Sequence, residues 1–266
     1  MKIRKALDRA QKERSNISEL PIDNEVNLST PVYSKSRQTH LDLKVLQKNL
    51  CVSYFDDSAV SDLYKVVRTQ IVQKLQDNGW RTLLISSALP GEGKSVTSIN
   101  LAITFAKELH QTVLLVDADL RKQNIHKYLG YESSTGLTDH LVNSVPLPDL
   151  IVWPEMGNLS IISGGQTVKD STEILSSKSM RMVVDEMKNR YKDRFIIFDC
   201  PPILTCPDTI SFAPLVDSIA MVVEANRTSI KDLKRAKNLI PAEKFLGFIL
   251  NKDIARGSKK YGYQHY

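Results

Sequence analysis

SALPGEGKS, residues 87–95, is the stretch that decides the fold of this 266-residue chain. It follows the apolar segment RTLLIS and precedes the helical pattern VTSINLAITFAKEL. Glycines at positions 91 and 93 let backbone N–H groups turn toward a phosphate, and the following helix N-terminus adds partial positive charge. In such a loop Lys94 reaches the β- and γ-phosphates, and the Ser95 hydroxyl is placed to bind Mg²⁺. We therefore expect a nucleoside triphosphate to be bound by Pro90, Gly91, Glu92, Gly93, Lys94, Ser95 and Val96.

Short apolar segments alternate with helical patterns on both sides of this loop. The expected strands are 81–86, 112–116, 158–163, 194–198, 218–224 and 245–250. Helical spacing of apolar residues covers 60–75, 97–108 and 178–191. Apolar runs this short, without polar alternation, are typical of strands buried on both faces. Repeated strand–helix–strand units predict an α/β fold with a doubly wound, mostly parallel sheet of the P-loop NTPase kind.

Composition and charge divide the chain into three expected parts. Residues 1–55 comprise a basic amphipathic helix over 1–14 and a polar, irregular linker, so the fold carries an N-terminal helical extension. Residues 56–255 form the P-loop domain. Residues 256–266 form a basic tail that contains Tyr261, Tyr263 and Tyr266.

Composition also excludes several classes of protein. Apolar residues make up 42% of the chain, but no apolar run approaches the ~18 residues that cross a bilayer. The start of the chain lacks the apolar stretch of a signal peptide. Three scattered cysteines form neither a metal-binding spacing nor a disulfide framework. We expect a cytoplasmic protein, with a net charge of +6 and no nucleic-acid partner.

Acidic residues end two of the expected strands. In VLLVDADLR, Asp117 and Asp119 emerge at the carboxyl end of a strand, which is the edge where open α/β sheets bind ligands. In RFIIFDCPP, Asp199 is the acid expected to hold Mg²⁺ opposite the phosphate loop. Asp117 is the candidate base and a further metal ligand, and Asp119 is a second metal-shell acid, although these two roles can be exchanged. Lys94 completes the catalytic set.

Each of two further polar residues has two possible roles. Asn251, at the end of FLGFILNK, has an amide that can read an adenine edge, or it is a turn residue at a strand end. Asp208 either orients the acidic cluster or caps a helix.

SALPGEGKS, VLLVDADLR and IIFDCPP, in this order and spacing, resemble the Walker A, A′ and B motifs of the bacterial tyrosine kinases (BY-kinases). The resemblance covers about residues 61–252 and includes GLTDHL, NLSIISGG and STEILSSKSM. These segments look most similar to the stand-alone cytoplasmic CpsD/CapB type associated with exopolysaccharide and exosortase systems.

The resemblance implies an ATP- and Mg²⁺-dependent kinase that autophosphorylates a C-terminal tyrosine cluster, for which Tyr261, Tyr263 and Tyr266 are the acceptors. It also implies control of exopolysaccharide or capsule synthesis or export, and a homo-oligomer recruited to the membrane. The expected activator is a membrane-bound polysaccharide chain-length regulator. A tyrosine hydroxyl has a pKa near 10, so it needs a positioned carboxylate to attack a phosphate.

The chain departs from this family at one motif and differs from a rival family at another. The oligomerisation motif Glu-x-x-Arg-x-x-Arg is represented by Asp62, Lys65 and Arg68, and lysine lacks the bidentate fork of arginine. The rival is a positioning ATPase of the MinD/ParA kind, which shares the fold. Those proteins carry a signature lysine near the start of the phosphate loop, where this chain has Leu89.

Overall fold

The computed structural model describes residues 37–56, 58–107, 112–190 and 194–253. All described residues belong to one compact unit, 33–266. The helix expected at 1–14 and the tyrosines of the tail (256–266) lie outside the described residues.

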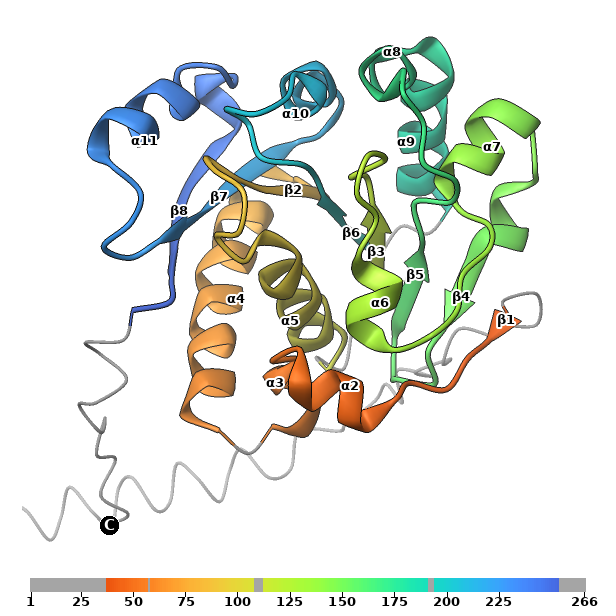
Figure 1. Ribbon diagram of the computed structural model, residues 1–266, viewed down its shortest axis with the longest axis horizontal. Helices are drawn as coiled ribbons and strands as arrows, with labels where there is room; N and C mark the ends of the chain where they lie inside the picture. The colour runs from red at the N-terminus through yellow and green to blue at the C-terminus, as the bar shows by residue number, and fades with distance from the viewer. Residues whose placement is uncertain (1–36, 57, 108–111, 191–193, 254–266) are drawn as a thin grey trace, which may run out of the picture. The chain divides into compact units, whose positions relative to one another are not determined.

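One sheet organises the described part of the chain, with its strands in the order β1-β4-β5-β3-β6-β2-β7-β8 (Figure 1). The strands are β1 (Arg37–Gln38), β2 (Thr82–Ser87), β3 (Thr112–Asp117), β4 (Ile151–Trp153), β5 (Leu159–Ile162), β6 (Arg194–Asp199), β7 (Ser218–Glu224) and β8 (Phe245–Asn251). Only the β4–β5 pair is antiparallel among these described strands. The predicted mostly parallel sheet is therefore confirmed, and β2, β3, β5, β6, β7 and β8 lie where strands were expected.

Helices connect most of these strands. The α-helices are α2 (Leu43–Lys48), α3 (Val52–Phe55), α4 (Ala59–Asn78), α5 (Lys94–Ala106), α6 (Ile125–Leu129), α7 (Leu137–Asn143), α8 (Ser171–Ser176), α9 (Lys178–Arg190), α10 (Asp208–Phe212) and α11 (Ile230–Lys237). Short 3₁₀ helices are η1 (Leu147–Leu150), η2 (Ala213–Leu215) and η3 (Ala242–Lys244). The three predicted helices correspond to α4, α5 and α9. Within the described residues, none of the helices combines the length and apolar character needed to cross a bilayer.

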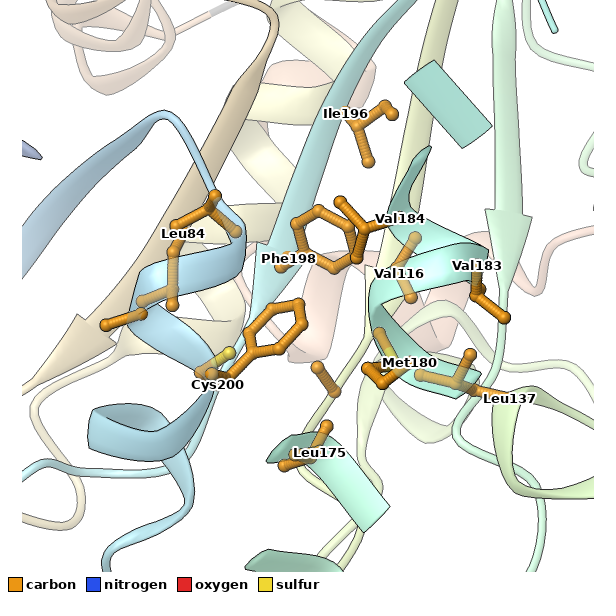
Figure 2. Close-up of a cluster of buried hydrophobic side chains, with 14 of the residues drawn as sticks. Leu84, Val116, Leu137, Leu175, Met180, Val183, Val184, Ile196, Phe198 and Cys200 are labelled. Atoms are coloured by element: carbon orange, nitrogen blue, oxygen red, sulfur yellow. The ribbon is translucent and has the colours of Figure 1, made fainter. Parts of the chain in front are cut away.

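The sheet is covered on both faces, because successive side chains of a strand point to opposite sides. Leu84 and Phe198 belong to one apolar core, which includes Val184 of α9, and Figure 2 shows Phe198 beside Val184 in this layer. Their strand neighbours Leu83 and Ile197 belong to the other core, which contains the buried apolar residues of α5. Two cores on opposite faces are the physical reason for continuous apolar strands.

The region 37–55, for which the sequence suggested a linker, carries β1, α2 and α3. Leu46 and Cys51 are fully buried in the same core as α5. Asn100 of α5 ties this region down: its amide donates to Leu50 O (2.9 Å) and accepts from Ser53 N (2.8 Å). Helices of four and six residues are too short to show a helical repeat of apolar residues, which is why the sequence pattern missed them.

The carboxyl ends of the central strands position the site. β2 pairs with β6, and β6 pairs with β3, all in parallel. The register places Asp117 beside Asp199, and Ile85 on β2 also lies opposite Asp199. The loop that follows β2 and the two predicted acidic strand ends therefore meet at one edge of the sheet.

Candidate functional site

The loop between β2 and α5 has the backbone form of a phosphate cradle. Gly91 and Gly93 have φ angles of 85° and 93°, which L side chains rarely adopt. Gly93 is also the residue that precedes the first turn of α5, and it has no side chain to bond the first amide groups of the helix. Those amides are left for an anion at the positive end of α5.

Three side chains of α5 converge on Asp199. Ser95 Oγ donates to Asp199 Oδ2 at 2.5 Å, and Ser98 Oγ lies 3.2 Å from Asp199 Oδ1. Lys94 Nζ lies 3.5 Å from Asp199 Oδ2 and 2.9 Å from Asp119 Oδ2. Ser98, four residues after Lys94 and thus on the same helix face, was not among the predicted site residues; its helical spacing is the signal that could have identified it.

Asp117 and Asp119 lie in the same cluster but have different partners. Asp117 is fully buried, and its carboxylate accepts hydrogen bonds from the backbone N–H groups of Asp119 (3.2 Å), Asn124 (2.9 Å) and Ile125 (3.1 Å). Asp119 accepts from Lys94 and from Lys122 N (2.9 Å). Asp117 thus holds the turn between β3 and α6, whereas Asp119 contacts the lysine of the phosphate loop.

Two acidic groups of this cluster, Asp117 and Asp199, resist ionisation. Burial, reinforced by repulsion from Asp199, raises the pKa of Asp117 to about 7. Burial also raises the pKa of Asp199, against the attraction of Lys94. Burial opposes the charge on Lys94, but the attraction of Asp199 and Asp119 prevails and raises its pKa above the ordinary value. The lysine is therefore charged, and its single positive charge is shared between Asp119 and Asp199.

The raised pKa values of Asp117 and Asp199 predict that the stability of the fold depends on pH. A carboxyl group whose pKa is higher in the folded chain than in the unfolded chain loses stabilising free energy as pH rises between the two values. Without a divalent metal ion, the melting temperature should therefore fall from about pH 5 to about pH 7, where Asp117 ionises. Burial, together with the neighbouring Lys127, lowers the pKa of His126, so the ionisation of His126 makes stability rise with pH instead of fall. The contribution of the acids is therefore isolated by comparing the wild type with Asp199→Asn, which keeps His126. That variant should show a shallower fall, and equal slopes would contradict this account.

The cluster fits a divalent cation together with phosphates. Asp117, Asp119 and Asp199 are all at most 4% exposed, and Lys94 pairs with only two of them. This leaves more buried carboxyl groups than cations, beside the Ser95 hydroxyl. Mg²⁺ prefers such oxygen ligands and usually combines one or two protein ligands with water and phosphate oxygens. The donor set therefore suits Mg²⁺ bound with a nucleotide.

The remaining predicted binding residues lie along the same loop. Pro90 and Gly91 are exposed, and Val96 is half-buried in the first turn of α5. Glu92, by contrast, is almost fully buried. Asn251 is placed against the loop, where its amide nitrogen donates to Glu92 O at 2.9 Å. This contact differs from the adenine contact considered for Asn251, which stays a prediction.

A second polar cluster lies beside the turn after β3. Asp208 is fully buried and accepts from Arg121 Nε (3.1 Å) and Nη2 (3.2 Å). The hydroxyls of Ser171 and Thr172, each 2.6 Å away, complete its partners. Burial opposes ionisation, but these hydrogen bonds keep the pKa of Asp208 below its ordinary value. Asp208 therefore links Arg121 to the start of α8; the sequence order of these residues contains no signal for that link.

This chain is similar to several known proteins. A family model described as an AAA domain matches residues 80–245. The tyrosine-protein kinase YwqD of Bacillus subtilis is 32% identical over 82% of this chain and 92% of the relative. The succinoglycan biosynthesis transport protein ExoP of Rhizobium meliloti is 31% identical over 77% of this chain, which corresponds to 26% of ExoP.

Solved structures of a tyrosine kinase and of a MinD protein resemble this chain to different degrees. The kinase domain of the Escherichia coli tyrosine kinase ETK matches 82% of this chain and 84% of its own, with a TM-score of 0.72 and 26% identity. The septum site-determining protein MinD of Pyrococcus horikoshii, complexed with Mg-ADP, matches 64% of this chain and 69% of its own, with a TM-score of 0.52 and 25% identity. The shared fold binds nucleotide, and the likeness to the kinase extends further along the chain.

Proposed function

This chain belongs to the bacterial tyrosine kinases, and we propose that it transfers the γ-phosphoryl group of ATP to tyrosines of its own C-terminal segment. The observation that carries the proposal is the convergence of Lys94, Ser95, Asp119 and Asp199 at the positive end of α5. The proposed acceptors are Tyr261, Tyr263 and Tyr266, because these three hydroxyls occur among six consecutive residues, 261–266, at the end of the basic tail.

The loop and Lys94 would bind the triphosphate of ATP. Lys94 is charged and pairs with Asp119, so it can exchange that carboxylate for a phosphate oxygen. Ser95 and Asp199 would hold Mg²⁺, with Asp117 beside them on the neighbouring strand. When bound, the ion supplies charge neutralisation on the transferred phosphoryl group.

A tyrosine hydroxyl must lose its proton as it attacks the γ-phosphate. We assign the proton acceptor to the pair Asp117 and Asp119. The contacts of the two residues differ in a way that bears on this role. Backbone amides hold Asp117, whereas Asp119 would be released when Lys94 turns to a phosphate. The variants Asp117→Asn and Asp119→Asn distinguish the two by the rate of a single turnover at saturating ATP.

Several wider roles follow as proposals. Relatives such as ExoP support a role in exopolysaccharide synthesis or export. We propose that the chain acts in the cytoplasm, at the inner face of the membrane, and is activated there by the cytoplasmic segment of a polysaccharide chain-length regulator. A homo-oligomer is supported by α4, which exposes Leu63 and Val66 next to Asp62.

Replacing all three tail tyrosines by Phe tests the proposed acceptors. Phenylalanine keeps the ring but has no hydroxyl, so incorporation of phosphate from labelled ATP should fall to background. Nucleotide affinity should stay unchanged, since the substitutions leave the loop intact. His265→Ala is a matched control in the same segment and should incorporate phosphate normally. Wild-type levels of phosphotyrosine in the triple variant would refute the assignment of the acceptors.

A further inference from the structure

The phosphate loop contains a buried carboxylate that cannot serve the phosphates directly. Glu92 is 1% exposed, and a negative side chain repels an anionic ligand. Within the loop, its Oε2 accepts from Leu89 N at 2.8 Å. Its Oε1 accepts from the hydroxyl of Thr228, and Glu224 N lies 3.5 Å away. Both of these partners belong to the segment that ends β7 and leads to α11.

A second segment, which follows β8, also contacts the loop. The amide nitrogen of Asn251 donates to Glu92 O, and Lys252 Nζ donates to Gly91 O at 2.6 Å. A Cβ atom on Gly93 would collide with the Asn251 side chain. A side chain at position 93 would therefore push the Asn251 amide away from Glu92 O, in addition to straining the backbone at a φ of 93°.

The two segments are also bound to each other. Glu224 Oε2 accepts from Arg227 Nη1 at 2.8 Å and from Lys252 Nζ at 3.1 Å. The carboxyl ends of β7 and β8 and the phosphate loop thus form one hydrogen-bonded unit, with Glu92 as its buried member. Elsewhere the loop is rich in glycine, whose backbone freedom opposes a single conformation.

We propose that Glu92 is a positioning residue, which fixes the phosphate-binding form of the loop by tying it to Thr228 and thereby to the segment after β7. Backbone amides bind phosphate well only if they already point at the ligand, because ordering them on binding costs free energy. The inference rests on nucleotide binding by the loop and not on the tyrosine acceptors, so the two can fail separately.

The test measures the dissociation constant of a fluorescent ADP analogue with Mg²⁺. Glu92→Gln removes the negative charge that strengthens the contacts with Leu89 N and Thr228, and Glu224 N then faces an N–H₂ donor. The Thr228 hydroxyl must also rotate to accept from the new amide, so the tie to the segment after β7 is weakened. Thr228→Val keeps the shape of the side chain but removes its hydroxyl, whereas Thr228→Ser keeps the hydroxyl. We expect Kd to rise about tenfold in Glu92→Gln and in Thr228→Val. Thr228→Ser should stay within about twofold of wild type.

The double variant and a stability control separate positioning from a merely structural role. Glu92→Gln with Thr228→Val should raise Kd little beyond Glu92→Gln alone, because both remove one shared contact. Melting temperatures without nucleotide show whether each variant is folded, and Lys231→Ala, an exposed change on α11, is the matched control. Equal Kd values for Thr228→Val, Thr228→Ser and wild type, all folded, would overturn the proposal.

Discussion

Lys94→Met should reduce tyrosine phosphorylation by roughly 10²–10³-fold, the usual cost of losing one preorganised charge at a reacting centre. Methionine fills a similar volume but carries no charge, so nothing replaces the ammonium group on the transferred phosphate. The change also leaves Asp119 and Asp199 without their shared cation. Part of the loss will therefore appear as weaker binding of ATP, because two buried carboxylates then face the phosphates.

The measurement is the initial rate of phosphotyrosine formation at several ATP concentrations, with circular dichroism to establish folding. Lys231→Met changes an exposed lysine on α11 in the same way and should leave the rate unaltered. Normal autophosphorylation by folded Lys94→Met protein would exclude Lys94 from the site.

Asp199→Asn is expected to separate activity from stability. Removing a carboxylate that faces the metal should lower the rate by roughly 10²–10³-fold, and added Mg²⁺ should not restore it. The melting temperature without nucleotide should stay equal or rise, since a buried ionised carboxylate costs free energy. Lys94 keeps its shorter contact with Asp119 at 2.9 Å, and the hydroxyls of Ser95 and Ser98 can rotate to bond the new amide.

Thermal unfolding and phosphorylation rate should be measured on the same preparations of wild type and Asp199→Asn. Asp185→Asn, at an exposed position of α9, is the matched control for the loss of one acidic charge. A marked fall in melting temperature for Asp199→Asn would show that Asp199 is a structural residue in the ligand-free chain, contrary to our assignment.

The central part of the fold could be predicted because its strands are buried on both faces. Such strands appear as uninterrupted apolar runs, and β2, β3 and β6 each lie within one residue of the predicted bounds. β4 was missed for the opposite reason. It has three residues and runs antiparallel to β5, so it neither shows a period nor repeats the strand–helix–strand unit.

The candidate site was only partly predictable for a similar reason. Lys94, Ser95 and the acids of β3 and β6 follow strands that end at one edge, so topology brings them together. The direction of a side chain within a loop has no such signature. Glu92 was grouped with the phosphate-binding residues by its place in the motif, yet it contacts Thr228, 136 residues away.

The most direct test of the tyrosine-kinase account is mass-spectrometric mapping of phosphotyrosine on the full chain after incubation with Mg·ATP. It should be run with and without the cytoplasmic segment of a polysaccharide chain-length regulator, beside Lys94→Met. We predict phosphate on Tyr261, Tyr263 or Tyr266 that is absent from the variant. Hydrolysis of ATP without phosphotyrosine under either condition would contradict the account and point to a positioning ATPase on the same fold.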